Sequence, residues 1–307
     1  MLLLLLLLVL CCCGVPLAID SFARPSVRAT PTRSVVQPTL FVRTHKTGSS
    51  TLTAILHRLS DLFNAPVFVV CHTSVELSSR EWNLSLGGDR LRLQRAHVRP
   101  RSLVLWSDHL VWNRAAKVVL LPRFVAAPRV ITLLRHPLEQ FRSACAFWSQ
   151  WNCSFVDLVR QRMRTGARLR SGEPWFASHF FDQFRHFEPR EAVLDAVPLI
   201  TEHWELSMVA LAHITGAPCD VLRVAQLKVS GAARSALLSA EQQLWLHREL
   251  ADEIAEYERA VSRLHDFVAA LPRAFRDDCL QAYRRAPTVS VADEAEWTRK
   301  RCNRHQL

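Results

Sequence analysis

Short runs of apolar residues alternate along the chain with stretches whose apolar positions recur every three or four residues. The runs lie at residues 40–42, 67–70, 103–106, 130–134, 197–200 and 220–225. The helical pattern is clear at Leu52, Ile55, Leu56 and Leu59, and similar patterns cover residues 138–148, 202–214 and 239–266. Buried strands that alternate with helices predict an α/β fold, with a parallel sheet and helices on both faces.

The first 39 residues do not share this pattern. Residues 1–19 are almost wholly apolar, which approaches the length of about 20 residues needed to cross a bilayer. They predict a cleaved signal peptide or a retained signal anchor, although arginines follow the tract and none precedes it, which fits an anchor poorly. Residues 20–39 are rich in Pro, Ser, Thr and Arg and predict a stem. Residues 40–307 then form the predicted luminal domain.

Composition adds a strong basic charge. The chain has 307 residues, 49% of them hydrophobic, and a formal net charge of +11. The apolar content is enough for a sizeable core, and the charge suggests an anionic partner. Lysine is much rarer than arginine in this chain and occurs only at positions 46, 117, 228 and 300. We expect no nucleic-acid partner, because no basic run, zinc-finger spacing or RNA-binding signature is present.

Cysteines and glycosylation sequons agree with a secretory route. Six cysteines follow the apolar leader, at positions 71, 145, 153, 219, 279 and 302. An even number permits up to three disulfides, and the sequence does not choose among the possible pairings. Asn83 and Asn152 begin glycosylation sequons. No cysteine or histidine spacing suggests zinc.

The segment after the first predicted strand carries the first candidate chemistry. It reads Thr44-His45-Lys46-Thr47-Gly48-Ser49-Ser50-Thr51. A loop with glycine and hydroxyl residues between a strand and a helix aims backbone N–H groups at phosphate. Gly48 permits close approach and Lys46 adds a mobile positive charge. The lysine precedes the glycine, so the loop is not the nucleotide-triphosphatase motif, in which lysine follows the last glycine.

The second candidate motif follows the predicted strand at residues 130–134. Arg135 stands at the end of that strand, Pro137 opens a predicted helix and Ser143 lies further along the helix. A guanidinium at a strand end can bind phosphate with two hydrogen bonds. Ligands of parallel sheets bind at the carboxyl ends of strands. We therefore expect this turn and the 44–51 loop on the same rim of the sheet.

Together these motifs resemble the galactose-3-O-sulfotransferase family, which includes the cerebroside sulfotransferases. The resemblance is carried by residues 41–51, by Leu134-Arg135, Pro137, Phe141 and Ser143, and weakly by residues 175–176 and 199–207. It implies a sulfotransferase-type P-loop fold in a single-pass type II Golgi membrane protein. It also implies transfer of sulfate from 3′-phosphoadenosine 5′-phosphosulfate to a galactose hydroxyl, the 3-hydroxyl, of a glycolipid or glycan.

The resemblance also implies roles for individual residues. Lys46 covers the leaving oxygen, and Arg135 with Ser143 binds the 3′-phosphate. The loop N–H groups from Thr47 to Thr51 bind the 5′-phosphate, and Arg43 helps to shape the donor pocket. The expected donor-binding residues are therefore Arg43, Lys46, Thr47, Gly48, Ser49, Ser50, Thr51, Arg135 and Ser143. No metal is needed when lysine supplies the positive charge. His109 is the candidate general base and His45 the second candidate.

Two departures from the family pattern leave alternatives open. Arg43 stands where the family has lysine, and Ser107-Asp108-His109 stands where the family has a histidine pair. A glycosaminoglycan sulfotransferase of the uronyl 2-O type, or a non-catalytic relative that binds donor or glycan, would carry the same donor motifs. His203 and Trp204 could line an acceptor site, although a core role is the simpler interpretation. The acceptor, the oligomeric state and cleavage of the leader stay open.

Overall fold

The computed structural model describes residues 37–63, 67–68, 103–105, 112–114, 117, 121, 127–148, 164, 183–188, 190–225 and 239–290. All of them fall within one compact unit, residues 34–307. The apolar leader, the stem, His109, Lys228 and both sequons lie outside the described residues. Within the described ranges, no helix is both long enough and apolar enough to cross a membrane.

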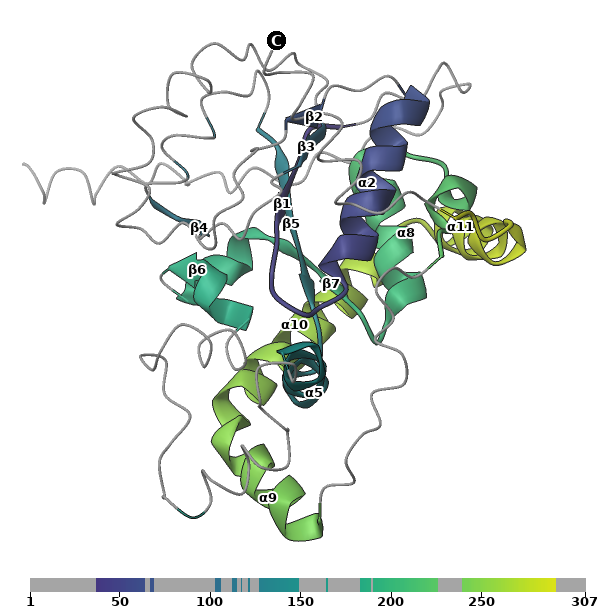
Figure 1. The fold of residues 1–307 in the computed structure, drawn as a ribbon. Helices are drawn as coiled ribbons and strands as arrows, with labels where there is room; N and C mark the ends of the chain where they lie inside the picture. The colour runs from purple at the N-terminus through teal and green to yellow at the C-terminus, as the bar shows by residue number, and fades with distance from the viewer. Residues whose placement is uncertain are drawn as a thin grey trace, which may run out of the picture. The chain divides into compact units, whose positions relative to one another are not determined.

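A five-stranded sheet forms the centre of the structure (Figure 1). Its strand order is β2-β3-β1-β5-β7, and every neighbouring pair is parallel. The strands are β1 (Thr39–Val42), β2 (Val67–Phe68), β3 (Leu103–Leu105), β5 (Arg129–Leu134) and β7 (Val197–Ile200). A second pair of strands joins β4 (Trp112–Asn113) to β6 (Phe187–Glu188).

Helices cover the sheet. The α-helices are α2 (Ser49–Phe63), α5 (Pro137–Trp148), α8 (Trp204–Thr215), α9 (Ala240–Glu249), α10 (Ala251–Ala269) and α11 (Arg273–Arg285). Among the described residues, η3 (Gln183–His186), η4 (Arg190–Asp195) and η5 (Cys219–Leu222) are short 3-10 helices. Figure 1 shows α2, α8 and α11 on one side of the sheet, with η3 and η4 beside β6 on the other. The predicted α/β class is confirmed.

Burial explains why the sequence pattern predicted the inner strands β1 and β5. Leu40, Phe41 and Val42 of β1 are all 0% exposed, as are Ile131 and Leu133 of β5. A parallel strand that is buried on both faces reads as a continuous apolar run. The predicted strands at 40–42, 103–106, 130–134 and 197–200 are therefore confirmed within a residue or two, and of the 67–70 run the structure describes only β2.

Two predicted elements were wrong. Residues 220–225 form no sheet strand, because the chain turns into η5 and only Val224 makes a single bridge, to Val289. A disulfide between Cys219 and Cys279 ties η5 to α11 instead. The helix predicted over 239–266 is divided at Leu250, where φ is −99° and ψ is 13°. A capping box of Ser239 and Gln242 starts α9.

The strand order also reverses between β1 and β5, which is the point where a parallel sheet of this kind opens a binding crevice. The chain leaves β1 toward β2 and β3 on one side and leaves β5 toward β7 on the other. At such a reversal the loops after two adjacent strands diverge, and ligands bind between them. Both candidate motifs follow these two strands, so the topology places them at the crevice.

Candidate anion-binding site

The β1–α2 loop contains two residues with left-handed backbone. Lys46 has φ 57° and Gly48 has φ 87°. A side chain at Gly48 would meet its nearest neighbour, Leu133 Cδ2, only at 3.7 Å. Space is therefore available at position 48, and the backbone conformation is what favours glycine there. These turns allow successive N–H groups to face one concavity, the arrangement that binds anions.

Threonine hydroxyls fix this loop to two neighbouring strands. Thr44 and Thr47 are both 0% exposed. The Thr44 hydroxyl donates to the Leu133 carbonyl, so Thr47 is the donor in the 2.9 Å contact between the two threonine oxygens. The Thr201 hydroxyl lies against the carbonyls of Thr47 and Leu134. The Thr47 side chain is thus used inside the protein, and only its backbone can serve an anion.

The start of α2 presents helix N-terminal amides. Thr51 and Leu52 donate their N–H groups to the Gly48 carbonyl, at 2.9 and 3.3 Å. The amides of Ser49 and Ser50 have no acceptor within the helix, as in any first turn. Arg43 brings a guanidinium to the same place, with Nε 3.3 Å from Ser49 Oγ and Nη2 3.5 Å from Ser50 Oγ. Positive charge and N–H dipoles therefore coincide at this helix start.

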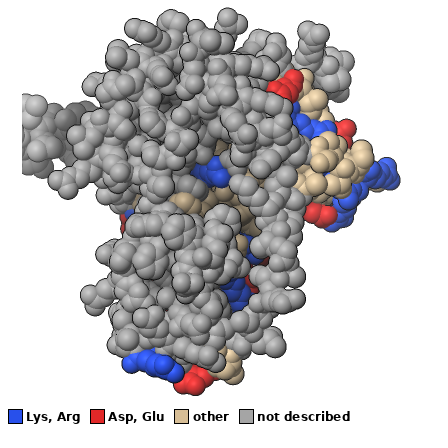
Figure 2. Space-filling view, in the orientation of Figure 1, with Lys and Arg blue, Asp and Glu red and all other residues tan. Residues whose placement is uncertain are grey.

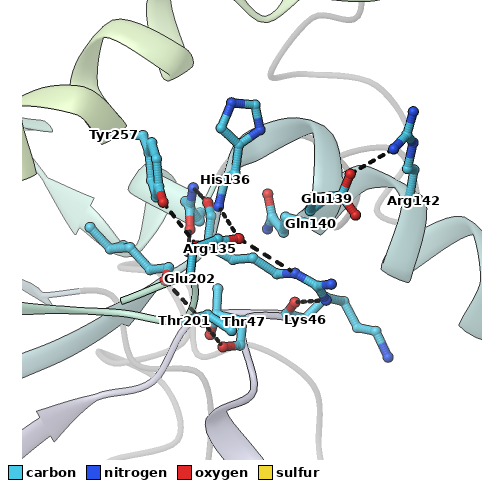
Figure 3. A network of polar contacts seen from close by, with 12 residues as sticks. Lys46, Thr47, Arg135, His136, Glu139, Gln140, Arg142, Thr201, Glu202 and Tyr257 are labelled. Atoms are coloured by element: carbon cyan, nitrogen blue, oxygen red, sulfur yellow. Dashed lines mark hydrogen bonds and ion pairs between the residues drawn. The ribbon is translucent and has the colours of Figure 1, made fainter. Parts of the chain in front are cut away.

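Arg135 joins the second motif to the first. Its Nη1 lies 3.5 Å from the Lys46 carbonyl, and Figure 3 shows its side chain extending toward that loop. The fully buried Gln183 side chain fixes the Arg135 backbone: Oε1 accepts the Arg135 N–H at 2.9 Å and Nε2 donates to the Arg135 carbonyl at 2.7 Å. The expectation that both motifs share one rim of the sheet is confirmed.

Helix α5 is tied to the loop from its first turn. Gln140 Nε2 donates to the His45 carbonyl at 3.0 Å. Ser143 lies six residues after Pro137, or about 9 Å along the helix. It is half-buried, and no hydrogen bond joins it to Arg135. The structure thus brings Lys46, Arg135 and the α2 start together, and leaves Ser143 on the adjacent helix.

Glu202 organises the far side of the Arg135 turn. Its Oε1 accepts the His136 N–H at 3.0 Å and lies 4.0 Å from Arg135 Nε. Its Oε2 accepts the Tyr257 hydroxyl at 2.9 Å (Figure 3). Burial, and then the nearby Glu202 charge and hydrogen bond, raise the pKa of Tyr257 well above its usual value. Tyr257 therefore stays neutral and donates throughout the physiological range.

The sequence did not single out Gln183, Glu202, Thr201 or Tyr257 for this site. Glu202 and Thr201 directly follow β7, so the rule that polar residues after buried strands meet at one rim could have found them. Gln183 and Tyr257 carry no such signal, because they reach the site from a 3-10 helix and from the middle of α10.

The two residues named for a possible acceptor site have structural contacts. Trp204 Nε1 donates to the Tyr283 hydroxyl at 3.1 Å, which agrees with a core role. His203 precedes α8, and its ring packs edge-on against His265 with centroids 4.9 Å apart.

Charged residues elsewhere on the described surface are largely mixed. Figure 2 shows basic and acidic side chains side by side at the edge where α11 lies. Arg284 contacts Glu205 there, with Nε 3.0 Å from Oε2, and Arg273 lies 3.4 Å from Asp277. In the described part of the chain, no three His, Cys, Asp or Glu side chains group closely enough to hold a metal.

Known proteins resemble this chain in structure and not in sequence. No protein-family model matches the sequence, and no curated protein matches it. Among solved structures, the fold is similar to the crystal structure of a sulfotransferase from Alicyclobacillus acidocaldarius. The TM-score is 0.40 and the sequence identity is 16%, over 79% of this chain and 100% of that chain.

Proposed function

We propose that the protein is a sulfotransferase that uses 3′-phosphoadenosine 5′-phosphosulfate. The observation that carries this proposal is the contact between the two candidate anion-binding motifs, in which the Arg135 guanidinium meets the Lys46 carbonyl. One anion-binding loop would fit many phosphate ligands. Two such elements at a single crevice suit a ligand with two separate phosphate groups, such as a 3′,5′-bisphosphate nucleotide.

The residues present fit such a donor. The amides at the start of α2 would hold the 5′-phosphate, with Lys46 covering charge on the leaving oxygen. Arg135 would hold the 3′-phosphate, and Ser143 would assist from α5. The transfer breaks the bond from sulfur to the bridging oxygen and forms a bond to an acceptor hydroxyl, whose proton passes to a base. His109 and His45 are the proposed bases, His109 from outside the described residues.

For the acceptor, we extend the proposal to a galactose 3-hydroxyl on a glycolipid or glycan, in the Golgi lumen. This acceptor class rests on the family resemblance as a whole, from residues 41–51 to residues 199–207, because other sulfotransferases share the donor motifs. The disulfide Cys219–Cys279 supports an oxidising compartment, because such bonds persist in the secretory pathway. Residues 1–19 would serve as the membrane anchor.

Donor binding is the first test. Titration calorimetry on the full-length chain in detergent should show tighter binding of adenosine 3′,5′-bisphosphate than of adenosine 5′-monophosphate. Arg135→Ala should weaken bisphosphate binding by about 10- to 100-fold, the range of a lost charge-assisted hydrogen bond. Arg273→Ala, which removes an exposed guanidinium on α11, is the matched control and should change nothing. Equal binding of both nucleotides by the wild-type protein would overturn the proposal.

Acceptor specificity is the second test. The chain is incubated with radiolabelled donor and a panel of galactosylceramide, lactose-terminated glycans and unsulfated heparan chains. Transfer to the galactose 3-hydroxyl is the expected result. Transfer to a uronyl 2-hydroxyl would assign the enzyme to the glycosaminoglycan class. Tight bisphosphate binding without transfer to any acceptor would indicate a non-catalytic relative.

A further inference from the structure

We infer that Glu202 is a positioning residue that orients Arg135 for the 3′-phosphate, and that Tyr257 holds Glu202 in place. The inference rests on the proposed function, since it concerns the same nucleotide site. Its evidence is separate, because neither residue belongs to the two motifs that suggested a donor. Glu202 comes after β7, and Tyr257 belongs to α10.

Glu202 contacts the Arg135 turn at two points. The same carboxylate oxygen, Oε1, accepts the backbone N–H of His136 and lies 4.0 Å from Arg135 Nε. Arg135 Nε is buried and has no hydrogen-bond acceptor, so this ion pair is its nearest compensation among the described residues. The carboxylate therefore fixes both the backbone after Arg135 and the direction in which its side chain leaves.

The remaining edge of the guanidinium is what a ligand would use. Among the described residues, Nη1 makes only a long contact, 3.5 Å, to the Lys46 carbonyl, and Nη2 makes no hydrogen bond. Glu202 thus occupies the Nε end and leaves the terminal nitrogens to an anion in the crevice. A guanidinium held in this way loses less rotational freedom when it binds a phosphate.

Tyr257 makes the carboxylate itself rigid. Its hydroxyl donates to Glu202 Oε2 at 2.9 Å, and its ring packs edge-on against His136 with centroids 5.3 Å apart. Glu202 is otherwise exposed at the surface, where a free glutamate would sample several rotamers. The buried Tyr257 hydroxyl selects the rotamer whose other oxygen faces Arg135 and His136.

The chain offers conservative variants for a test. Glu202→Gln keeps an oxygen that can accept from His136 but removes the charge near Arg135. Tyr257→Phe keeps the ring against His136 and removes only the hydroxyl. Glu258→Gln is the matched control, because it neutralises an exposed carboxylate next in sequence to Tyr257 and outside this network. All are measured as full-length chains in detergent.

The readout is the ratio of the adenosine 5′-monophosphate Kd to the adenosine 3′,5′-bisphosphate Kd. Only the 3′-phosphate distinguishes these ligands, so a general loss of structure would not change the ratio selectively. We expect Glu202→Gln to reduce the ratio by about threefold to fivefold, the upper range for a partly exposed ion pair. Tyr257→Phe should reduce it by about twofold to threefold, the lower end of the range for one hydrogen bond, because Tyr257 acts on Arg135 only through Glu202. Glu258→Gln should leave it unchanged.

A double-mutant cycle with Arg135→Ala tests whether Glu202 acts through Arg135. If Glu202 acts through Arg135, Glu202→Gln will have no further effect on the ratio once Arg135 is alanine. An unchanged ratio in Glu202→Gln, or an undiminished effect in the Arg135→Ala background, would overturn this inference. Either result would leave the proposed donor site standing, because that proposal fails when the wild-type protein does not prefer the bisphosphate.

Discussion

The rim around Lys46 and Arg135 differs instructively from the packing of α8, η5 and α11. Both regions join segments that lie far apart in sequence, and both do so with polar contacts. At the rim, hydrogen bonds fix backbones and direct side chains while Arg135 Nη2 keeps its donors unused by the described residues. In the region of α8, η5 and α11, by contrast, charged and polar groups pair with other groups of the protein.

Individual contacts in the α8 region show this internal pairing. Arg284 pairs with Glu205, and this hydrogen bond lowers the pKa of the Glu205 carboxyl. Arg223 Nη1 donates to the carbonyl of Ala286 at 2.8 Å, and the disulfide joins η5 to α11. The comparison suggests that substitutions in the α8 region change stability alone, whereas substitutions at the rim change ligand binding or catalysis more than stability.

The largest expected effect is at the rim. Lys46→Ala should lower the transfer rate by about 100- to 1,000-fold, the cost of removing one preorganised charge from a leaving group. The melting temperature should change little, because Lys46 lies on a loop that the threonines hold. Lys117→Ala is the matched control, since Lys117 pairs with Asp195 away from the crevice. A transfer rate within twofold of wild type in Lys46→Ala would contradict the expectation that substitutions at the rim lower activity.

The disulfide should show the opposite behaviour. Cys219→Ser should lower the free energy of unfolding by about 2–4 kcal/mol, with an unchanged bisphosphate Kd at low temperature. Urea unfolding measures the first quantity and calorimetry the second. Reduction of the wild-type protein should reproduce the loss and serves as a check if the variant expresses poorly. A weakened Kd in folded, reduced protein would mean that the two regions are coupled.

Each of the two regions contains one glycine with a positive φ, so the same substitution can be compared in both. Gly48 has φ 87° in the loop, and Gly216 has φ 72° at the end of α8, where its N–H donates to the Ala212 carbonyl. Alanine at either position should cost about 1–2 kcal/mol of stability, the penalty of left-handed backbone. Only Gly48→Ala should also weaken bisphosphate binding. Equal binding by both variants would argue against the loop as the phosphate site.

The smallest expected effect is a pH dependence in the α8 region. The His213 ring packs against Phe267 and Phe275, and burial, with the nearby Arg129 charge, lowers the pKa of His213. The folded protein therefore binds this proton more weakly than the unfolded chain. Its stabilising contribution is complete above the unfolded pKa of about 6.5 and falls as the pH drops toward the lower folded pKa. His213→Gln should flatten the stability profile below pH 6.5 in urea unfolding, and an unchanged profile would contradict this assignment.

The sequence alone determined the features that depend on local pattern. Strands β1 and β5 are apolar runs because parallel strands are buried on both faces. The loop at 44–51 and Arg135 could be predicted as candidate anion-binding elements because each directly follows a predicted strand and each motif is continuous in sequence. The strand predicted at 220–225 failed because a run of this length forms a strand only when a sheet edge receives it, and here the disulfide holds the segment against α11.

Tertiary structure alone decided which groups surround Arg135. Gln183 is 48 residues from Arg135, and Glu202 is 66 from His136 and 55 from Tyr257. No periodicity or short spacing links residues so far apart. Their contacts exist because the strand order puts β7 beside β5 and because α10 packs against β7 and α5, which brings a glutamine, a carboxylate and a buried hydroxyl to one turn. The candidate anion-binding loop depends on local sequence, but the orientation of the arginine beside it is a consequence of the fold.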